Sequence, residues 1–322
     1  MPLFNIRHVT RYSYEQPVRD SANQIILFPL KDTYQEVTRQ DLKITGEPPV
    51  ELYEDYYGNT IGSFTYAETH REMVIDSHIE VTVTAKPLPD DDNPAVMQWR
   101  HLDDIRHSFP YIDFIKTERF DALGELQSIP EITQAGGRSP LAVSLTLNEF
   151  IFNNFTYNSG VTDVETTLDE VWTLKAGVCQ DFAHVLLVTL HTMGIPARYV
   201  SGYICPNKNG MRGEGATHAW VEAYIPFYGW LGLDPTNNCI VNDLHVRLAT
   251  GRSFGDVSPV KGTYRGSSSH VLEVGVTISY EDGSITGASA ASLPEVPLTT
   301  STKINGNSYR HHLEMMQQQQ QQ

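Results

Sequence analysis

Three residues that together could perform nucleophilic catalysis follow one another in the order Cys179, His218 and Asp234. A thiolate is a useful nucleophile and a thiol is not, so a catalytic cysteine needs a base beside it. A histidine can take and return the proton, and a carboxylate beyond it can hold the imidazole in one tautomer. The pattern indicates a catalytic triad in which Cys179 attacks, His218 transfers the proton and Asp234 orients the ring.

The residues around Cys179 place it at the start of a buried helix. Behind it, apolar residues recur with a helical period at Phe182, Ala183, Leu186, Leu187, Leu190 and Met193. Gly194 and Pro196 then end the pattern. Free N–H groups and the positive end of the helix dipole favour a thiolate in the first turn. We also expect Gly177 to loosen the backbone just before the cysteine.

His218 and Asp234 fall on the two strands of a predicted hairpin. Residues 217–225 alternate like a half-buried strand, 226–229 have the composition of a turn, and 230–236 form the returning strand. Neighbouring strands of a hairpin bring their side chains together, so we expect the histidine to lie beside the aspartate.

These three motifs resemble those of a known family. Gly-Val-Cys-Gln-Asp-Phe, Thr-His-Ala-Trp-Val-Glu and Trp-Leu-Gly-Leu-Asp-Pro-Thr, in this order, are similar to the motifs of the transglutaminase-like superfamily of cysteine enzymes. The spacings of 39 and 16 residues between the triad positions suit its small bacterial members. The motif resemblance covers roughly Ser139 to Pro259, and Phe4 to about Pro87 resembles the β-rich region that precedes the core in bacterial members.

The resemblance implies an α+β fold, in which an N-terminal antiparallel β domain precedes a papain-like core with a helix packed on an antiparallel sheet. It implies acyl transfer from glutamine-type or peptide amides through a thioester, with no metal and no organic cofactor. Water would give hydrolysis, deamidation or proteolysis and an amine would give transamidation, and the sequence does not choose between them. Two other functions stay open: an acyltransferase that uses a thioester donor with the same triad, and a non-catalytic peptide-binding module.

The residues that could complete the site are less well defined. The backbone N–H of Cys179 is the natural first donor of an oxyanion hole. The indole of Trp172, the hydroxyl of Tyr157 and the amide of Gln180 are candidates for the second, although the two aromatic residues could simply pack. Trp220 beside His218 could wall the pocket. Cys205 and Cys239 lack the spacing of a zinc site, so no metal site is predicted.

Composition limits the partners. The chain has 322 residues, a net charge of −16 and a pI near 5.1, which argues against nucleic acid and anionic membranes. Three cysteines do not suggest a disulfide framework. Together with the lack of a signal-like or membrane-spanning run, they predict a cytoplasmic protein. We expect a protein or peptide substrate, and the oligomeric state is not predicted.

The predicted organisation has five parts: an N-terminal β domain at 1–88, a linker and helical segment at 89–137, a transglutaminase-like catalytic core at 138–260, a C-terminal strand at 261–283 and a disordered low-complexity tail at 284–322. Within these parts, Ser139 and Pro140 open a helix. Residues 167–174 predict a short helix and 242–248 another, 206–215 a loop beside the site, and 271–280 a strand that returns to one of the sheets.

Overall fold

The structure is a computed structural model that describes residues 2–116, 118–162, 166–205, 211–213 and 216–281. The predicted tail at 284–322 and most of the predicted loop at 206–215 lie outside these residues. The chain divides into two units, Met1–Val83 with Ser258–Gln322, and Thr84–Val257. Within the described ranges, no helix has the length and apolar character needed to cross a membrane.

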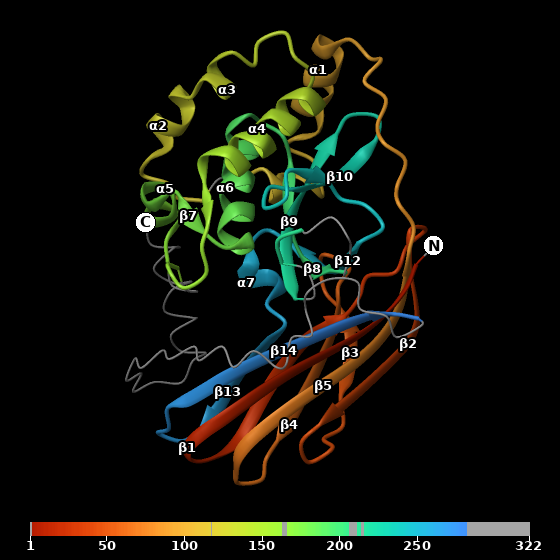
Figure 1. The fold of residues 1–322 in the computed structure, drawn as a ribbon, viewed down its shortest axis with the longest axis vertical. Coiled ribbons are helices and arrows are strands. Elements are labelled where there is room, and N and C mark those ends of the chain that lie inside the picture. The colour runs from red at the N-terminus through yellow and green to blue at the C-terminus, as the bar shows by residue number, and fades with distance from the viewer. Residues whose placement is uncertain (1, 117, 163–165, 206–210, 214–215, 282–322) are drawn as a thin grey trace. The chain divides into compact units, whose positions relative to one another are not determined.

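The first unit is organised on one long strand, β1 (Leu3–Phe28). The first half of β1 pairs with β5 (His70–Val83) and β14 (His270–Tyr280). The second half pairs with β4 (Thr60–Tyr66) and β13 (Val260–Arg265). All these pairings are antiparallel, and Figure 1 shows β14 alongside β1. The strand expected at 271–280 therefore returns to the N-terminal sheet.

Two further strands complete this sheet, with β2 (Gln35–Ile44) beside β5 and β3 (Glu51–Glu54) beside β4. The alternation of β1 explains which face is buried. Its early inward positions are at most 2% exposed and comprise Phe4, Ile6, His8 and Thr10. A side-chain period of two places every second residue on the same face, so these residues share the core.

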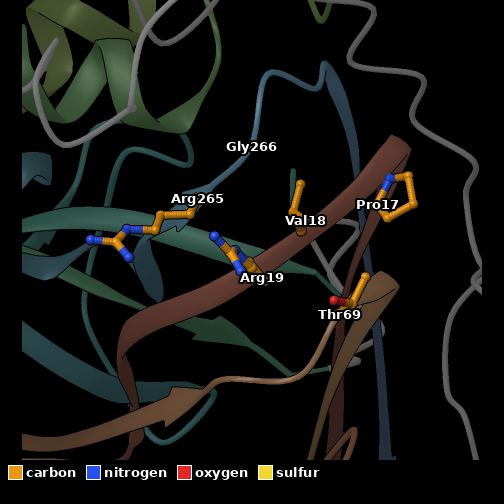
Figure 2. A pocket seen from close by; sticks show the side chains of 6 residues that line it. All are labelled: Pro17, Val18, Arg19, Thr69, Arg265 and Gly266. Atoms are coloured by element: carbon orange, nitrogen blue, oxygen red, sulfur yellow. The ribbon is translucent and has the colours of Figure 1, made fainter.

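This unit also has a surface pocket of about 280 Å³ (Figure 2), lined by Pro17, Val18, Arg19, Thr69, Arg265 and Gly266. Its two guanidinium groups share one acidic neighbour, because Nε of Arg19 lies 3.8 Å and Nη1 of Arg265 lies 3.5 Å from Oδ2 of Asp20. The two arginine side chains are largely exposed and Asp20 is partly exposed, and such surface ion pairs contribute little to the stability of the fold. None of the predicted site residues lines this pocket.

The second unit combines helices with an antiparallel sheet in the order β11-β10-β9-β8-β12. Its strands are β8 (Ala197–Ile204), β9 (Thr217–Ile225), β10 (Gly229–Asp234), β11 (Cys239–Ile240) and β12 (His245–Gly251). Helix α6 (Cys179–Thr192) packs on β9 and β8, and α4 (Pro140–Asn154) packs against α6, as Figure 1 shows. This arrangement confirms the predicted α+β fold.

Shorter elements surround the central helices of this unit. They are α1 (Ala95–Ile105), η1 (Tyr111–Phe114), α2 (Leu123–Ser128), α3 (Pro130–Thr133), β6 (Thr156–Tyr157), α5 (Leu168–Leu174), β7 (Ala176–Gly177) and α7 (Phe254–Val257). The N-termini of α4 and α5 are both capped by hydroxyl side chains, as residues of this type favour. The Ser139 hydroxyl accepts a hydrogen bond from the Ala142 N–H at 3.1 Å, and Thr167 with Glu170 forms a capping box on α5.

The prediction of a short helix at 242–248 is wrong, because β12 occupies most of this stretch. Its first residue, His245, pairs with Ile204 at the end of β8, and the N–H of Cys205 donates to the Leu244 carbonyl at 2.8 Å. Strand β8 would otherwise present unpaired backbone groups along its outer edge. Backbone pairing with that edge therefore determines the conformation of this segment, whereas local preference does not.

Candidate active site

The predicted nucleophile occupies the first position of a helix. Helix α6 begins at Cys179 after the N-cap residue Val178. The buried carboxylate of Asp181 secures this turn, since its Oδ2 accepts from the Val178 N–H at 2.8 Å and from the Thr162 hydroxyl at 2.7 Å. An acidic side chain at this position also complements the positive helix end. The sulfur is thus presented at the N-terminus of a well-anchored helix.

The reason for Gly177 differs from the expected one. Its backbone does not adopt a positive φ, so freedom to reach the left-handed region is not needed. A Cβ at this position would instead collide with the carboxylate of Asp181. Gly177 is therefore required by the close approach of the capping carboxylate, which itself holds the turn before Cys179.

His218 and Asp234 form a buried pair. Nε2 of His218 on β9 lies 3.0 Å from Oδ2 of Asp234, the last residue of β10, and both side chains are at 0% exposure. The carboxylate can only accept, so Nε2 carries the hydrogen and donates it. Nδ1 is buried and has no regular hydrogen bond to any described residue. The aspartate thereby fixes the tautomer and leaves Nδ1 as the proton acceptor.

Electrostatic interactions shift the pKa values of both members of this pair. Burial alone would lower the pKa of His218, but the attraction of Asp234 and Cys179 outweighs it and raises the pKa to about 10. Burial would raise the pKa of Asp234, yet its interactions with His218 and His245 hold it far below the usual range. Cys179 is thus close enough to His218 to affect its pKa, so the three residues of the predicted triad interact electrostatically.

Asp234 has further partners that the sequence analysis missed. Its Oδ1 accepts from the backbone N–H groups of Thr236 at 2.9 Å and Asn237 at 3.3 Å. Its Oδ2 accepts from the Asn237 side chain at 2.7 Å and lies 3.4 Å from Nε2 of His245. The backbone bonds form an Asx-type turn, which the Asp-Pro-Thr-Asn sequence could have suggested. No local sequence pattern predicts that His245 lies beside Asp234, because the pairing of β12 with β8 places it there.

A short turn covers the open nitrogen of His218. Gly213 has φ +81°, and a Cβ added to it would lie 2.7 Å from Nδ1 of His218. Asn237 holds this turn, since its Oδ1 accepts from the Arg212 N–H at 2.7 Å and its Nδ2 donates to the Arg212 carbonyl at 3.1 Å. Asn237 therefore connects the turn to the carboxylate of Asp234.

Two of the four other predicted site residues lie beside the predicted triad. Tyr157 on β6 pairs with Gly177, two residues before Cys179, and burial, with a contribution from Cys179, raises its pKa to about 12. Trp220 is fully buried, and its ring stacks on His218 with centroids 6.2 Å apart at 28°. Trp220 is therefore one wall of the histidine's pocket.

Among the described residues, the side chains of the other two, Trp172 and Gln180, make no hydrogen bond or ring contact with Cys179, His218 or Asp234. Trp172 is buried at the end of α5 between Phe120 and Phe155, with the Lys175 ammonium 2.9 Å from its ring centre. These contacts are those of a packing aromatic residue. Gln180, the second residue of α6, is half-buried and makes no side-chain hydrogen bond with the described residues.

The fold and this cluster define a papain-like α+β protein with a cysteine at a helix start facing a buried histidine–aspartate pair. Residues 128–235 match the transglutaminase-like superfamily, and residues 4–82 match the bacterial transglutaminase-like N-terminal region. The chain belongs to the transglutaminase-like superfamily.

Several known proteins are similar over most or part of the chain. An uncharacterised protein of Mycobacterium tuberculosis is 32% identical over 293 residues, which cover 85% of this chain and 92% of that protein. A protein-glutamine gamma-glutamyltransferase of Pseudomonas aeruginosa is 30% identical over 146 residues, covering 43% of this chain and 20% of the enzyme. A Cytophaga hutchinsonii crystal structure, provisionally assigned as a cysteine protease, has a TM-score of 0.66 at 22% identity and covers 91% of this chain and 96% of its own. This last likeness shows the fold.

Proposed function

We propose that this protein catalyses cysteine-dependent acyl transfer from glutamine-type or peptide amides through a thioester. The observation that carries the proposal is the state of His218. Its Nε2 donates to Asp234 at 3.0 Å while its Nδ1 has no other described partner and lies in the field of Cys179. A histidine oriented by a carboxylate and open toward a thiol is the arrangement that nucleophilic catalysis requires.

In the resting enzyme, Nδ1 of His218 has taken the thiol proton, because its raised pKa favours an imidazolium–thiolate pair. In the first step, the thiolate sulfur of Cys179 attacks the amide carbon. The carbonyl oxygen becomes an oxyanion, and the N-terminus of α6 points backbone N–H groups toward such a charge. The hydroxyl of Tyr157 is the preferred second donor, because Tyr157 pairs with Gly177, two residues before Cys179, and its pKa responds to the charge of Cys179.

In the second step, the tetrahedral intermediate collapses, the carbon–nitrogen bond breaks and His218 gives its proton to the leaving amine. The acyl group then stays on Cys179 as a thioester. Water or an amine, deprotonated by the same Nδ1, attacks the thioester and regenerates the thiol. Water yields hydrolysis or deamidation and an amine yields transamidation, so the identity of the second nucleophile sets the product.

Limiting iodoacetamide followed by intact-protein mass spectrometry tests the nucleophile. Wild type should take one label quickly at Cys179, and labelling should become slow in His218→Ala and be lost from this position in Cys179→Ala. The other two free cysteines of the chain serve as internal controls. Cys205 is fully buried and Cys239 is half-buried, so neither should take the first label. Slow labelling that does not depend on His218 would refute an activated thiol and favour a peptide-binding module.

A second assay separates the reactions. A glutamine-containing peptide should release ammonia in the presence of wild type and not of Cys179→Ala. With cadaverine added, transamidation gives a mass increase on the peptide, whereas hydrolysis gives only the deamidated product. Turnover of an acyl–coenzyme A thioester without amide turnover would instead identify an acyltransferase.

The cytoplasmic location remains part of the proposal. The three cysteines are all free, which suits a reducing compartment in which a catalytic thiol stays reduced. Cell fractionation with a periplasmic or secreted marker tests it, and recovery with that marker would contradict it.

A further inference from the structure

A second chemical cluster shares one residue with the triad. The ligand-type atoms of Asp234, Cys239 and His245 all lie within 4.8 Å of one another. They come from three strands, because Asp234 ends β10, Cys239 stands opposite it on β11 and His245 begins β12. We propose that these residues form a zinc-type metal site, and that metal bound there inhibits the triad. The inhibitory part rests on the proposed function.

The distances suit a small tetrahedral ion. Zinc binds nitrogen and oxygen ligands at about 2.0–2.1 Å, which places two such ligands about 3.3 Å apart around a tetrahedral ion. Nε2 of His245 and Oδ2 of Asp234 are already 3.4 Å apart. A sulfur bond of about 2.3 Å places the thiolate about 3.6 Å from either ligand. The three ligand atoms lie within 4.8 Å of one another, so Cys239 needs to move by about 1.2 Å at most.

His245 can present its nitrogen to a metal without losing its support. Its Nδ1 lies 3.4 Å from the N–H and 3.3 Å from the Oδ1 of Asn242. Without metal, Nδ1 accepts from that N–H and Nε2–H faces Asp234. With metal, the proton sits on Nδ1 and is donated to Oδ1, which frees Nε2. A metal-bound histidine normally donates its other ring N–H in this way.

The charges and ligand types select the ion. One carboxylate and one thiolate neutralise a divalent cation, which suits a site where Asp234 and His245 are at most 1% exposed. Sulfur and imidazole nitrogen favour zinc-like ions over magnesium or calcium. Binding releases one proton, from the thiol of Cys239, while the histidine proton only changes nitrogen. Cys239 is half-buried, so an ion can reach it before the two buried ligands.

Occupancy would act on catalysis through Asp234. Oδ2 of Asp234 faces Nε2 of His245 and is therefore the oxygen placed to bind the metal, and the same oxygen accepts the hydrogen bond from His218. Coordination withdraws charge from this oxygen and weakens its hold on the imidazole. His218 then loses both the fixed tautomer and the support for its positive form, so the thiol is no longer deprotonated efficiently.

The binding test uses the full-length Cys179→Ala variant, so that the predicted nucleophile contributes no ligand and activity plays no part. Equilibrium dialysis should find about one zinc ion per chain, and Co²⁺ should give a thiolate charge-transfer absorption band. Cys239→Ser in this background should remove the band and weaken zinc affinity at least about tenfold. Cys205→Ala, which removes a thiol outside the cluster, should retain both.

His245→Gln gives a second check if Cys239→Ser fails to fold, as far-ultraviolet circular dichroism would reveal. It should also weaken zinc binding at least about tenfold. Absence of zinc binding, or a Co²⁺ band unchanged by Cys239→Ser, would overturn the site. In the otherwise wild-type enzyme, zinc should suppress amide turnover while magnesium does not, and Cys239→Ser should need at least about tenfold more zinc for the same fractional loss. Binding without inhibition would retain the site and overturn its regulatory role.

Discussion

Nε2 of His218 and Oδ2 of Asp234 lie 3.0 Å apart, between two side chains that are fully removed from solvent. Replacing Asp234 by Asn keeps the shape but removes the charge and offers an amide that can support the wrong tautomer. We expect turnover to fall on the order of 10²–10⁴-fold. The lost charge-assisted hydrogen bonds should lower the free energy of unfolding by about 1–3 kcal/mol.

Amide turnover and a urea titration measure the two effects of Asp234→Asn. Asp103→Asn is the matched control, because its side chain on α1 is 70% exposed and forms a surface ion pair with Arg106. This control should change neither quantity by more than a small margin. Turnover of Asp234→Asn equal to wild type would remove Asp234 from the triad.

The turn over His218 gives a second prediction. Gly213→Ala places a methyl group against Nδ1 and should displace the imidazole, lowering turnover by about 10²-fold. Gly137→Ala is matched in backbone strain, since Gly137 also has φ +81° but has nothing within 4 Å of its added Cβ. Both variants should lose about 1–2 kcal/mol of stability to the left-handed backbone. Equal turnover in the two would show that Gly213 does not approach the reacting nitrogen.

Gly177 gives a third prediction, this time for the nucleophile. Gly177→Ala forces the added methyl group against the carboxylate of Asp181, which should lower the free energy of unfolding by about 1–3 kcal/mol. The same clash disturbs the first turn of α6, so alkylation of Cys179 should slow. Gly136→Ala, at a glycine with ordinary φ and open space, is the control. Alkylation at an unchanged rate would mean that the turn absorbs the methyl group.

The stability of the first unit should depend on pH through His8. This residue is 1% exposed, and burial lowers its pKa from 6.5 to about 4. Between pH 6.5 and about pH 4, His8 therefore binds a proton in the unfolded chain but not in the folded chain. Stability is full above about pH 6.5 and falls as the pH drops toward 4, by up to about 3 kcal/mol from this residue.

Urea titrations of wild type and His8→Gln between pH 7 and 4 measure this contribution, because their difference cancels the other histidines. His8→Gln should show a shallower loss of stability with falling pH. Identical slopes in the two proteins would show that His8 is charged or solvated in the folded state.

The sequence by itself determined the parts of this protein that depend on neighbours along the chain. Helical periodicity after Cys179 predicted α6, and strand alternation around His218 and Asp234 predicted β9 and β10. The order and spacing of the three motifs indicated the superfamily to which the chain belongs. Within one helix or hairpin, the spacing along the sequence determines which residues lie on the same face, so these elements can be predicted without a structure.

Only the tertiary structure decided which distant residues join that hairpin. Backbone pairing of β12 with β8 carries His245 to Asp234, and pairing of β11 with β10 sets Cys239 opposite it. Packing of Asp181 makes Gly177 necessary, and Asn237 holds the turn over His218. Strand pairing is made by N–H and C=O groups that every residue except proline possesses. Strand pairing therefore has no residue-specific sequence pattern. For this reason the sequence could predict the triad but not the cluster of Asp234, Cys239 and His245.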